Sequence, residues 1–191
     1  MKTIRAFIAV PLSAAIKTLL QQMQERLANP GLQVVWVRPD TMHLTVKFLG
    51  ETAQALIPQI IEALRGAAAE VPAFTLTLTE VGAFPNLNYP RVLWVGWKNE
   101  SASLATLHAR LEERLAALGI ERDARHFAPH LTLGRVKSVQ RKGSLLRQVH
   151  AAQQGLHAEV HVDSCALFRS ELNPTGAIHT LVENVALLGS N

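Results

Sequence analysis

The sequence has only one cysteine, Cys165, so it cannot form an internal disulfide bond. It also has no Cys-x-x-Cys pair and no Cys/His spacing of the zinc-finger type. Proteins without disulfides or structural zinc are typical of reducing compartments, which favours the cytoplasm. Cys165 lies in an apolar, strand-like stretch, and we expect a buried structural thiol there rather than a nucleophile.

Long hydrophobic runs are missing as well. The apolar run nearest the N-terminus, Ala6–Val10, ends at Pro11, whereas a membrane span needs about 20 residues. Lys2, Arg5 and the small residues at 13–15 only weakly imitate a secretion signal. We therefore expect the protein to remain in the cytoplasm and not to associate with membranes.

No long run of basic residues is present either, although 19 Lys and Arg against 15 Asp and Glu give a net charge of +4. This bias favours a polyanionic partner such as nucleic acid or a phosphorylated metabolite, and it equally fits a soluble protein with a slightly basic surface. The 191 residues, of which 48% are hydrophobic and 18% charged, are typical of a globular chain. We expect one domain over residues 1–191, built of two lobes.

The predicted elements are present twice in the same order. The first half reads as a strand at 4–10, a helix capped by Ser13, strands at 34–37 and 43–50, a helix at 53–65 and a strand at 74–79. The second half reads as a strand at 92–95, a helix capped by Ser101 or Ser103, a strand at 130–135, a helix at 144–154 and a strand at 158–168; a last strand covers 177–188. Gly82–Asn88 and the turn at 173–176 read as loops. This order predicts an α+β fold: a duplicated, two-lobed domain in which each lobe is a mainly antiparallel sheet covered by helices. The lobes would be related by an approximate twofold axis, with a central active-site groove between them.

A His-x-Thr segment stands at the same place in each half. Side chains two residues apart in a strand point to the same face, so His43 projects with Thr45 and His130 with Thr132. A half-exposed strand with an incidental histidine explains either copy alone, whereas the duplication favours a functional pair. Two imidazoles suit acid and base catalysis near neutral pH, because one can be neutral while the other is protonated. Threonine hydroxyls can hold phosphate oxygens, so the pattern points to phosphoryl chemistry without a metal or an organic cofactor.

Longer stretches carry a family resemblance. The segments HLTVKFLG at 43–50 and HLTLGR at 130–135 resemble the paired motifs of the two-histidine phosphoesterase superfamily. RAFIAVPL near the start, WVRPDTMHLTVKFLG and LFRSELNPTGAIHT near the end are similar to the bacterial and archaeal RNA 2′,3′-cyclic phosphodiesterases, historically called 2′-5′ RNA ligases.

The resemblance implies hydrolysis of an RNA-terminal 2′,3′-cyclic phosphate to a 2′-phosphomonoester. It assigns His43 as the general acid on the 3′ oxygen, His130 as the base for water, and Thr45 and Thr132 as phosphate ligands; spacing alone does not say which histidine is which. Alternatives are 2′-5′ RNA ligation, hydrolysis of another cyclic nucleotide, and a noncatalytic module that binds RNA ends. A monomer suffices, because one chain supplies both motifs.

Other residues are weaker candidates. Arg135 is a candidate phosphate contact, although strict alternation points it away from Thr132 unless Gly134 allows a bulge. Phe7 is a candidate for stacking on a base, whereas we expect Trp94, its partner in the repeat, to pack in the core. Lys47 shares the parity of Thr45, and is either a source of positive potential or a solvated strand lysine.

The remaining histidines carry no expected function. His126 and His130 have a helical zinc-binding spacing, but Pro129 opposes helical geometry, so we expect no metal site there. We assign five others to the surface or to ordinary hydrogen bonding: His108, His150, His157, His161 and His179.

Overall fold

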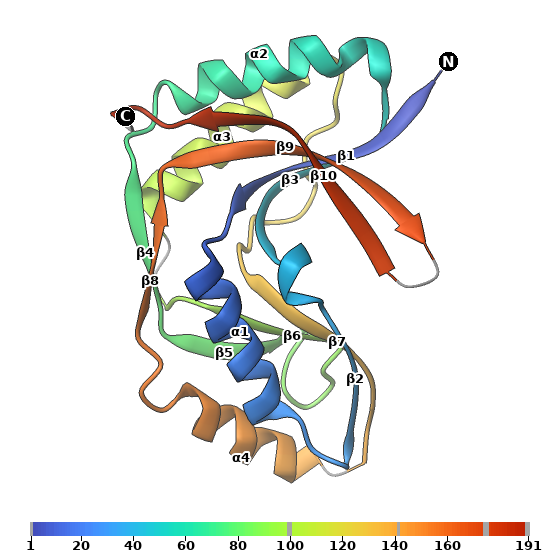
Figure 1. The fold of residues 1–191 in the computed structure, drawn as a ribbon, viewed down its shortest axis with the longest axis vertical. Helices are drawn as coiled ribbons and strands as arrows, with labels where there is room; N and C mark the ends of the chain where they lie inside the picture. Colours follow the sequence, from blue (N-terminus) through green and yellow to red (C-terminus); the bar gives the residue numbers. More distant parts are fainter. Residues whose placement is uncertain (1, 99–100, 141, 174–175, 190–191) are drawn as a thin grey trace.

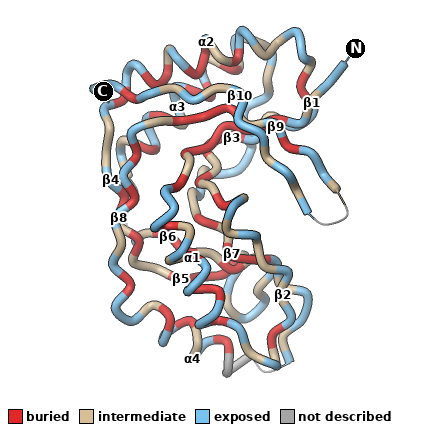
Figure 2. Tube along the Cα trace, viewed as in Figure 1, coloured by how far each residue is buried: buried red, intermediate tan, exposed pale blue. Residues whose placement is uncertain are grey.

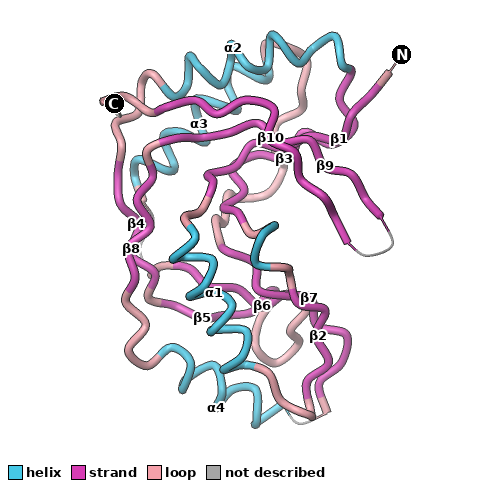
Figure 3. Tube along the Cα trace, viewed as in Figure 1, coloured by secondary structure: helices cyan, strands magenta, loops and turns pink. Residues whose placement is uncertain are grey.

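The protein is described here from a computed structural model, which covers residues 2–98, 101–140, 142–173 and 176–189 (Figure 3). Its strands are β1 (Thr3–Pro11), β2 (Leu32–Trp36), β3 (His43–Ala53), β4 (Phe74–Leu78), β5 (Glu80–Phe84), β6 (Val92–Gly96), β7 (Leu131–Val139), β8 (Ala158–Val162), β9 (Ser164–Asn173) and β10 (Gly176–Ala186). Its helices are α1 (Ala14–Leu27), α2 (Ile57–Ala68), α3 (Ala102–Ala116) and α4 (Lys142–Gln153), with short 3-10 turns η1 (Pro39–Thr41) and η2 (Gln54–Leu56). The α+β architecture expected from the sequence is confirmed.

Two four-stranded antiparallel sheets form the two lobes (Figure 1). The upper sheet in the figure has the order β10-β9-β1-β3 and the lower sheet the order β2-β7-β6-β5. The halves of the chain are exchanged between them, because β2 of the first half pairs with β7, while β9 and β10 of the second half join β1 and β3. The ribbon formed by β4 and β8 connects the lobes.

The first helix of each half begins in the same way. Ser13 accepts a hydrogen bond from the Ile16 amide at 3.3 Å, and Ser101 does the same for Leu104 at 3.3 Å. Such serine caps satisfy amide groups that have no partner within the helix. Behind the caps, apolar residues spaced by three and four positions place one side of each helix in the hydrophobic core: Ile16, Leu20, Met23 and Leu27 in α1, and Leu104, Leu107, Leu111 and Leu115 in α3. Buried segments of the chain occur in both lobes (Figure 2).

Helix α1 ties the first half of the chain to the second. The buried Gln24 amide donates to the carbonyl of Val37, just before η1, at 2.7 Å, and to that of Leu133 in β7 at 2.8 Å. The Val37 amide also donates to the Leu133 carbonyl at 2.9 Å. The segment that leads to the first His-x-Thr motif is therefore joined to the strand that carries the second.

Helix α3 makes the reciprocal connection. Glu112 forms an ion pair with Lys47 of β3 at 2.5 Å and accepts a hydrogen bond from the Asp123 amide at 3.1 Å. Asp123 lies in the segment that leads to His130, so α3 joins that segment to the strand of the first motif. Gln24 and Glu112 occupy corresponding places, each eleven residues after its capping serine.

Several boundaries differ from the sequence-based expectation. We expected a loop over Gly82–Asn88, but Gly82–Phe84 belongs to β5, because it pairs with β6. The strand expected at 158–168 is divided at Asp163 and serves two sheets. The turn expected at 173–176 includes Pro174 and Thr175, which lie outside the described residues.

Among the residues that the structure describes, no helix is long and apolar enough to cross a bilayer.

Replacement of Gln24 by Met tests the connection made by α1. The variant leaves two carbonyls without the buried amide donor, so the free energy of unfolding should fall by about 1–2 kcal/mol. Urea denaturation measures it, with Gln21→Met at an exposed position of the same helix as the control. Equal stability of the two variants would contradict a structural role for the Gln24 amide.

Candidate active site

His43 stands at the first position of β3, opposite Pro11 of β1. Its Nδ1–H donates to the Thr41 carbonyl at 2.8 Å, since a carbonyl oxygen can only accept. Its ring stacks on Phe7 with 4.5 Å between centroids. The backbone bond fixes the tautomer in which Nε2 carries the lone pair.

His130 directly precedes β7 and repeats this arrangement. Its Nδ1–H donates to the Ala128 carbonyl at 2.7 Å, again two residues earlier in the chain. Its ring meets the edge of Phe84 with 4.8 Å between centroids. Both imidazoles therefore present Nε2 as the atom available for proton transfer.

Thr45 lies on the same face of β3 as His43, and Thr132 of β7 stands two residues after His130. In the first sheet, Pro11 and Ala9 of β1 lie opposite His43 and Thr45, and alternate residues of β1 share a face. In the second sheet Thr132 lies opposite Trp94. The strands of the two motifs, β3 and β7, contact each other where the sheets meet.

Burial lowers the pKa of both histidines. The pKa of His43 falls to about 4, mainly by desolvation and partly through the positive charges of His179 and Lys17, while the bond to Thr41 opposes the shift. Desolvation also lowers the pKa of His130, against the effect of its bond to Ala128. Both imidazoles are thus neutral in the ligand-free protein at neutral pH.

Phe7 does not occupy the position that we expected. It is only 3% exposed, and its ring contacts those of His43 and Phe168, the latter with 5.3 Å between centroids. A ring with so little exposed area has almost no surface left for a base. The observed contact of Phe7 is with the catalytic candidate His43, whose imidazole it holds by stacking.

His179 is a residue of this region that sequence reasoning missed. We assigned it to the surface or to ordinary hydrogen bonding, but its ring meets His43 edge-on with 5.1 Å between centroids. It lines a cavity of about 270 Å³ together with His43, Phe168, Lys17 and Asn184. Its buried Nδ1 has no hydrogen-bond partner among the residues that the structure describes, and desolvation lowers its pKa. No local pattern signals it, because β10 reaches His43 only through the order of the sheet.

Arg135 is exposed and lies on the Thr132 face. The bulge that Gly134 was expected to allow is present, because the register of β6 and β7 shifts between Thr132 and Gly134. A Cβ on Gly134 would come within 2.5 Å of Val34 and 3.0 Å of the Val35 carbonyl, so β2 packs closely only against glycine. Trp94 is half-buried and stacks on Phe84 at 5.3 Å.

Lys47 is neither solvated nor on the His43 face. It is 2% exposed, and its ammonium contacts Glu112 at 2.5 Å and Asp123 at 3.1 Å. A register shift between Thr45 and Lys47 turns it to the opposite face of β3. Glu112, Asp123 and His108 bring potential metal-ligand atoms within 4.8 Å of one another, but the Lys47 ammonium already supplies the positive charge there.

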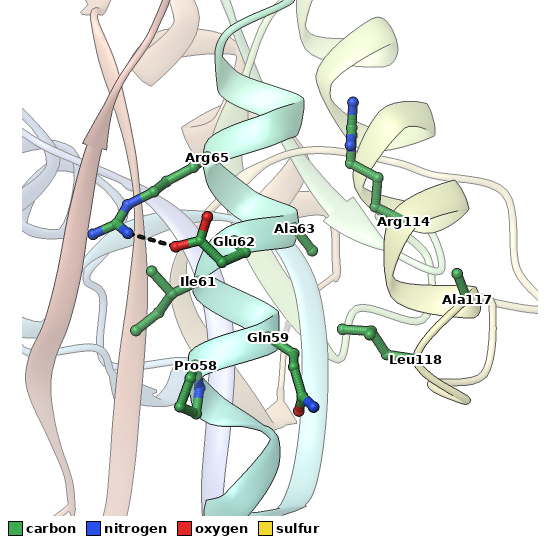
Figure 4. Close-up of a pocket in the computed structure, with 9 residues that line it drawn as sticks. All are labelled: Pro58, Gln59, Ile61, Glu62, Ala63, Arg65, Arg114, Ala117 and Leu118. Atoms are coloured by element: carbon green, nitrogen blue, oxygen red, sulfur yellow. Dashed lines mark hydrogen bonds and ion pairs between the residues drawn. The ribbon is translucent and has the colours of Figure 1, made fainter.

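A larger hollow lies between α2 and α3, and none of the motif residues lines it (Figure 4). Its Arg65 side chain is paired with Glu62 at 2.6 Å and Glu183 at 3.0 Å, and Arg114 is paired with Glu70. Both guanidinium groups are thus neutralised by carboxylates. No histidine lines this hollow, and we place the site at the His-x-Thr motifs instead.

Cys165 is fully buried, as expected. Its thiol lies 3.6 Å from the Ala9 carbonyl, and burial raises its pKa to about 12. A thiol in this environment does not act as a nucleophile near neutral pH.

The low pKa of His43 makes stability depend on pH. Between pH 6.5 and about 4 the unfolded chain binds a proton at this residue that the folded chain does not, so acidification destabilises the fold. His43→Gln should remove about 2 kcal/mol of the loss in unfolding free energy between pH 7 and pH 4.5. Urea denaturation at both pH values checks this, with exposed His157→Gln as the control. The same pH dependence in both variants would contradict the buried state of His43.

The contact between His179 and His43 has a separate consequence. His179→Ala should admit water to the His43 ring and raise its pKa, because desolvation is the main cause of the shift. His179→Phe should keep the ring buried and the pKa low. NMR titration of the His43 ring protons distinguishes these results, and an unchanged pKa in His179→Ala would rule out shielding by His179.

Comparison with known proteins agrees with these observations. A family model described as LigT-like phosphoesterase matches the chain twice, at residues 10–94 and 95–179. An RNA 2′,3′-cyclic phosphodiesterase of Methanothermobacter thermautotrophicus is 31% identical and covers 94% of this chain and 97% of its own. One from Aquifex aeolicus is 31% identical over 99% of this chain and 100% of its own.

Solved structures show the same fold. The crystal structure of TT0787 from Thermus thermophilus has a TM-score of 0.78 and 28% identity, with 98% of this chain and 100% of the other covered. The structure of E. coli LigT complexed with 3′-AMP has a TM-score of 0.74 and 26% identity, covering 97% and 99%. With two family matches that together span most of its length, the chain belongs to the LigT-like phosphoesterases, an enzyme family of the two-histidine phosphoesterase type.

Proposed function

We propose that the protein hydrolyses RNA 2′,3′-cyclic phosphate ends to 2′-phosphomonoesters, using His43 and His130 and no metal ion. The observation that carries this proposal is the repeated tautomer arrangement, in which each imidazole donates Nδ1–H to a carbonyl two residues earlier. The names of the relatives, RNA 2′,3′-cyclic phosphodiesterases, supply the substrate class.

In the proposed reaction a water molecule attacks phosphorus. His130 Nε2 accepts a proton from that water, and a new P–O bond forms. The bond from phosphorus to the 3′ oxygen breaks, and His43 Nε2 donates its proton to the leaving oxygen. Atoms and charge balance, because one proton enters at His130 and one leaves at His43; the roles of the histidines follow from the family resemblance.

The low pKa of His43 is compatible with its role as an acid. A cyclic phosphodiester carries one negative charge, and an anion bound beside a buried imidazole favours the protonated form. His43 would therefore gain its proton when substrate binds, while His130 keeps its lone pair. Thr45, which shares the face of His43, and Thr132, two residues after His130, would donate hydrogen bonds to the nonbridging oxygens.

Arg135 supports this assignment on the second sheet. Its exposed guanidinium shares the Thr132 face and provides a positive charge for a phosphate or a nucleotide. We further propose that residues 1–191 act as one two-lobed, cytoplasmic unit, and that a monomer is active because β3 and β7 of one chain bear both motifs.

Product mapping tests the proposal. An oligonucleotide with a 2′,3′-cyclic phosphate end, incubated in EDTA, should yield a 2′-phosphate, and His43→Ala and His130→Ala should each reduce kcat by about 10²–10⁴-fold. Thr45→Val and Thr132→Val should have smaller effects of the same direction, because they remove one hydrogen bond each. His157→Ala serves as the control.

Each other outcome is informative. A 2′-5′-linked product would favour ligation, and tight binding without turnover would favour a noncatalytic module. Full activity in either histidine variant would refute the two-histidine scheme.

A further inference from the structure

The two sheets contain the same irregularity at corresponding positions. In the first, Thr45 pairs with Ala9 and Lys47 with Ile8, so Val46 is an extra residue in β3. In the second, Thr132 pairs with Trp94 and Gly134 with Leu93, so Leu133 is the extra residue in β7. Each bulge thus follows the motif threonine directly.

A bulge shifts the alternation of side chains by one residue. The residue three positions after each threonine therefore returns to the threonine face, where simple alternation would turn it away. In β7 this residue is Arg135, opposite Val92, and in β3 it is Phe48, opposite Phe7. Phe48 and Arg135 therefore occupy corresponding places on the two faces that bear the motifs.

Both side chains are open to solvent. Phe48 is 64% exposed, which is unusual for a phenyl ring within a sheet, and Arg135 is exposed as well. The Phe48 ring lies 6.1 Å from Phe7, which in turn stacks on His43. The exposed Phe48 ring is thus separated from the catalytic candidate His43 only by the ring of Phe7.

We propose, on the basis of the proposed function, that Phe48 is the stacking platform for the nucleobase of the terminal nucleotide. A nucleotide combines a planar aromatic base with an anionic phosphate, and the two corresponding positions offer an aromatic ring and a guanidinium. Stacking on Phe48 tolerates any base, because every base has an aromatic face. Phe48 takes the role that the sequence suggested for Phe7, whose neighbouring ring on β1 is buried.

Two substrates separate base stacking from support of the catalytic histidine. The first is an oligonucleotide ending in a 2′,3′-cyclic phosphate; the second is 1-O-methylribose 2′,3′-cyclic phosphate, which has no base. Phe48→Ala should raise KM for the oligonucleotide by about 5- to 100-fold, change kcat by less than about twofold and leave the abasic substrate unaffected. Phe48→Trp should restore KM, and Phe48→Leu, which keeps apolar area without an aromatic face, should not.

Ile178→Ala is the matched control, because Ile178 is 47% exposed in the same sheet but lies in alternation with His179, on the other face. It should behave like the parent protein with both substrates. Thermal unfolding of every variant establishes that the fold is retained.

Three results would overturn the proposal: an unchanged KM in Phe48→Ala, an equal loss with the abasic substrate, or full restoration by Phe48→Leu. If the parent protein turns over neither substrate, the proposed function fails. The role of Phe48 can still be tested by calorimetry, which compares how parent and Phe48→Ala bind adenosine 2′-monophosphate and ribose 2-phosphate. Weaker binding of the nucleotide alone to Phe48→Ala supports stacking, and equal binding to parent and variant contradicts it.

Discussion

Two buried polar side chains, Gln24 and Glu112, hold the halves of this chain together at the motifs. Each reaches from the first helix of its own half to the motif strand of the other half, and each also binds the segment that leads to the motif of its own half. A buried amide or carboxylate without partners would be costly, so these bonds specify one relative placement of β3 and β7. The carboxylate is neutralised by Lys47, which explains why a charged residue stands in the interior.

The bulges then decide which side chains can reach a substrate. After each extra residue, the following position points toward the core, and the position after that points to the face that bears the motif. On the first strand Lys47 becomes a structural cation and Phe48 becomes exposed. On the second, Gly134 lets β2 pack closely and Arg135 becomes exposed. The same bulge, present in both sheets, thus exposes an aromatic residue on β3 and a cationic residue on β7.

Much of this arrangement was predictable from the sequence, because local patterns determine it. Serine caps and leucine spacing located α1 and α3, and the duplicated motifs indicated two similar lobes, which the double family match confirms. Alternation placed His43 with Thr45 correctly, and Gly134 indicated a bulge that the register contains. The errors arise where structure depends on distant pairing. Alternation alone placed Lys47 on the wrong face, because nothing in β3 itself announces the extra residue. The exchange of β2 between halves and the approach of His179 to His43 follow from strand order, which has no local signal.

The central claim is that one imidazole from each half acts on a single phosphorus atom, one as acid and the other as base. The pH dependence of kcat/KM for a 2′,3′-cyclic phosphate substrate tests it most directly, measured for the parent, His43→Gln and His130→Gln. The account predicts a bell-shaped profile for the parent, loss of the alkaline limb in His43→Gln and loss of the acidic limb in His130→Gln. Two intact limbs in both variants would contradict it.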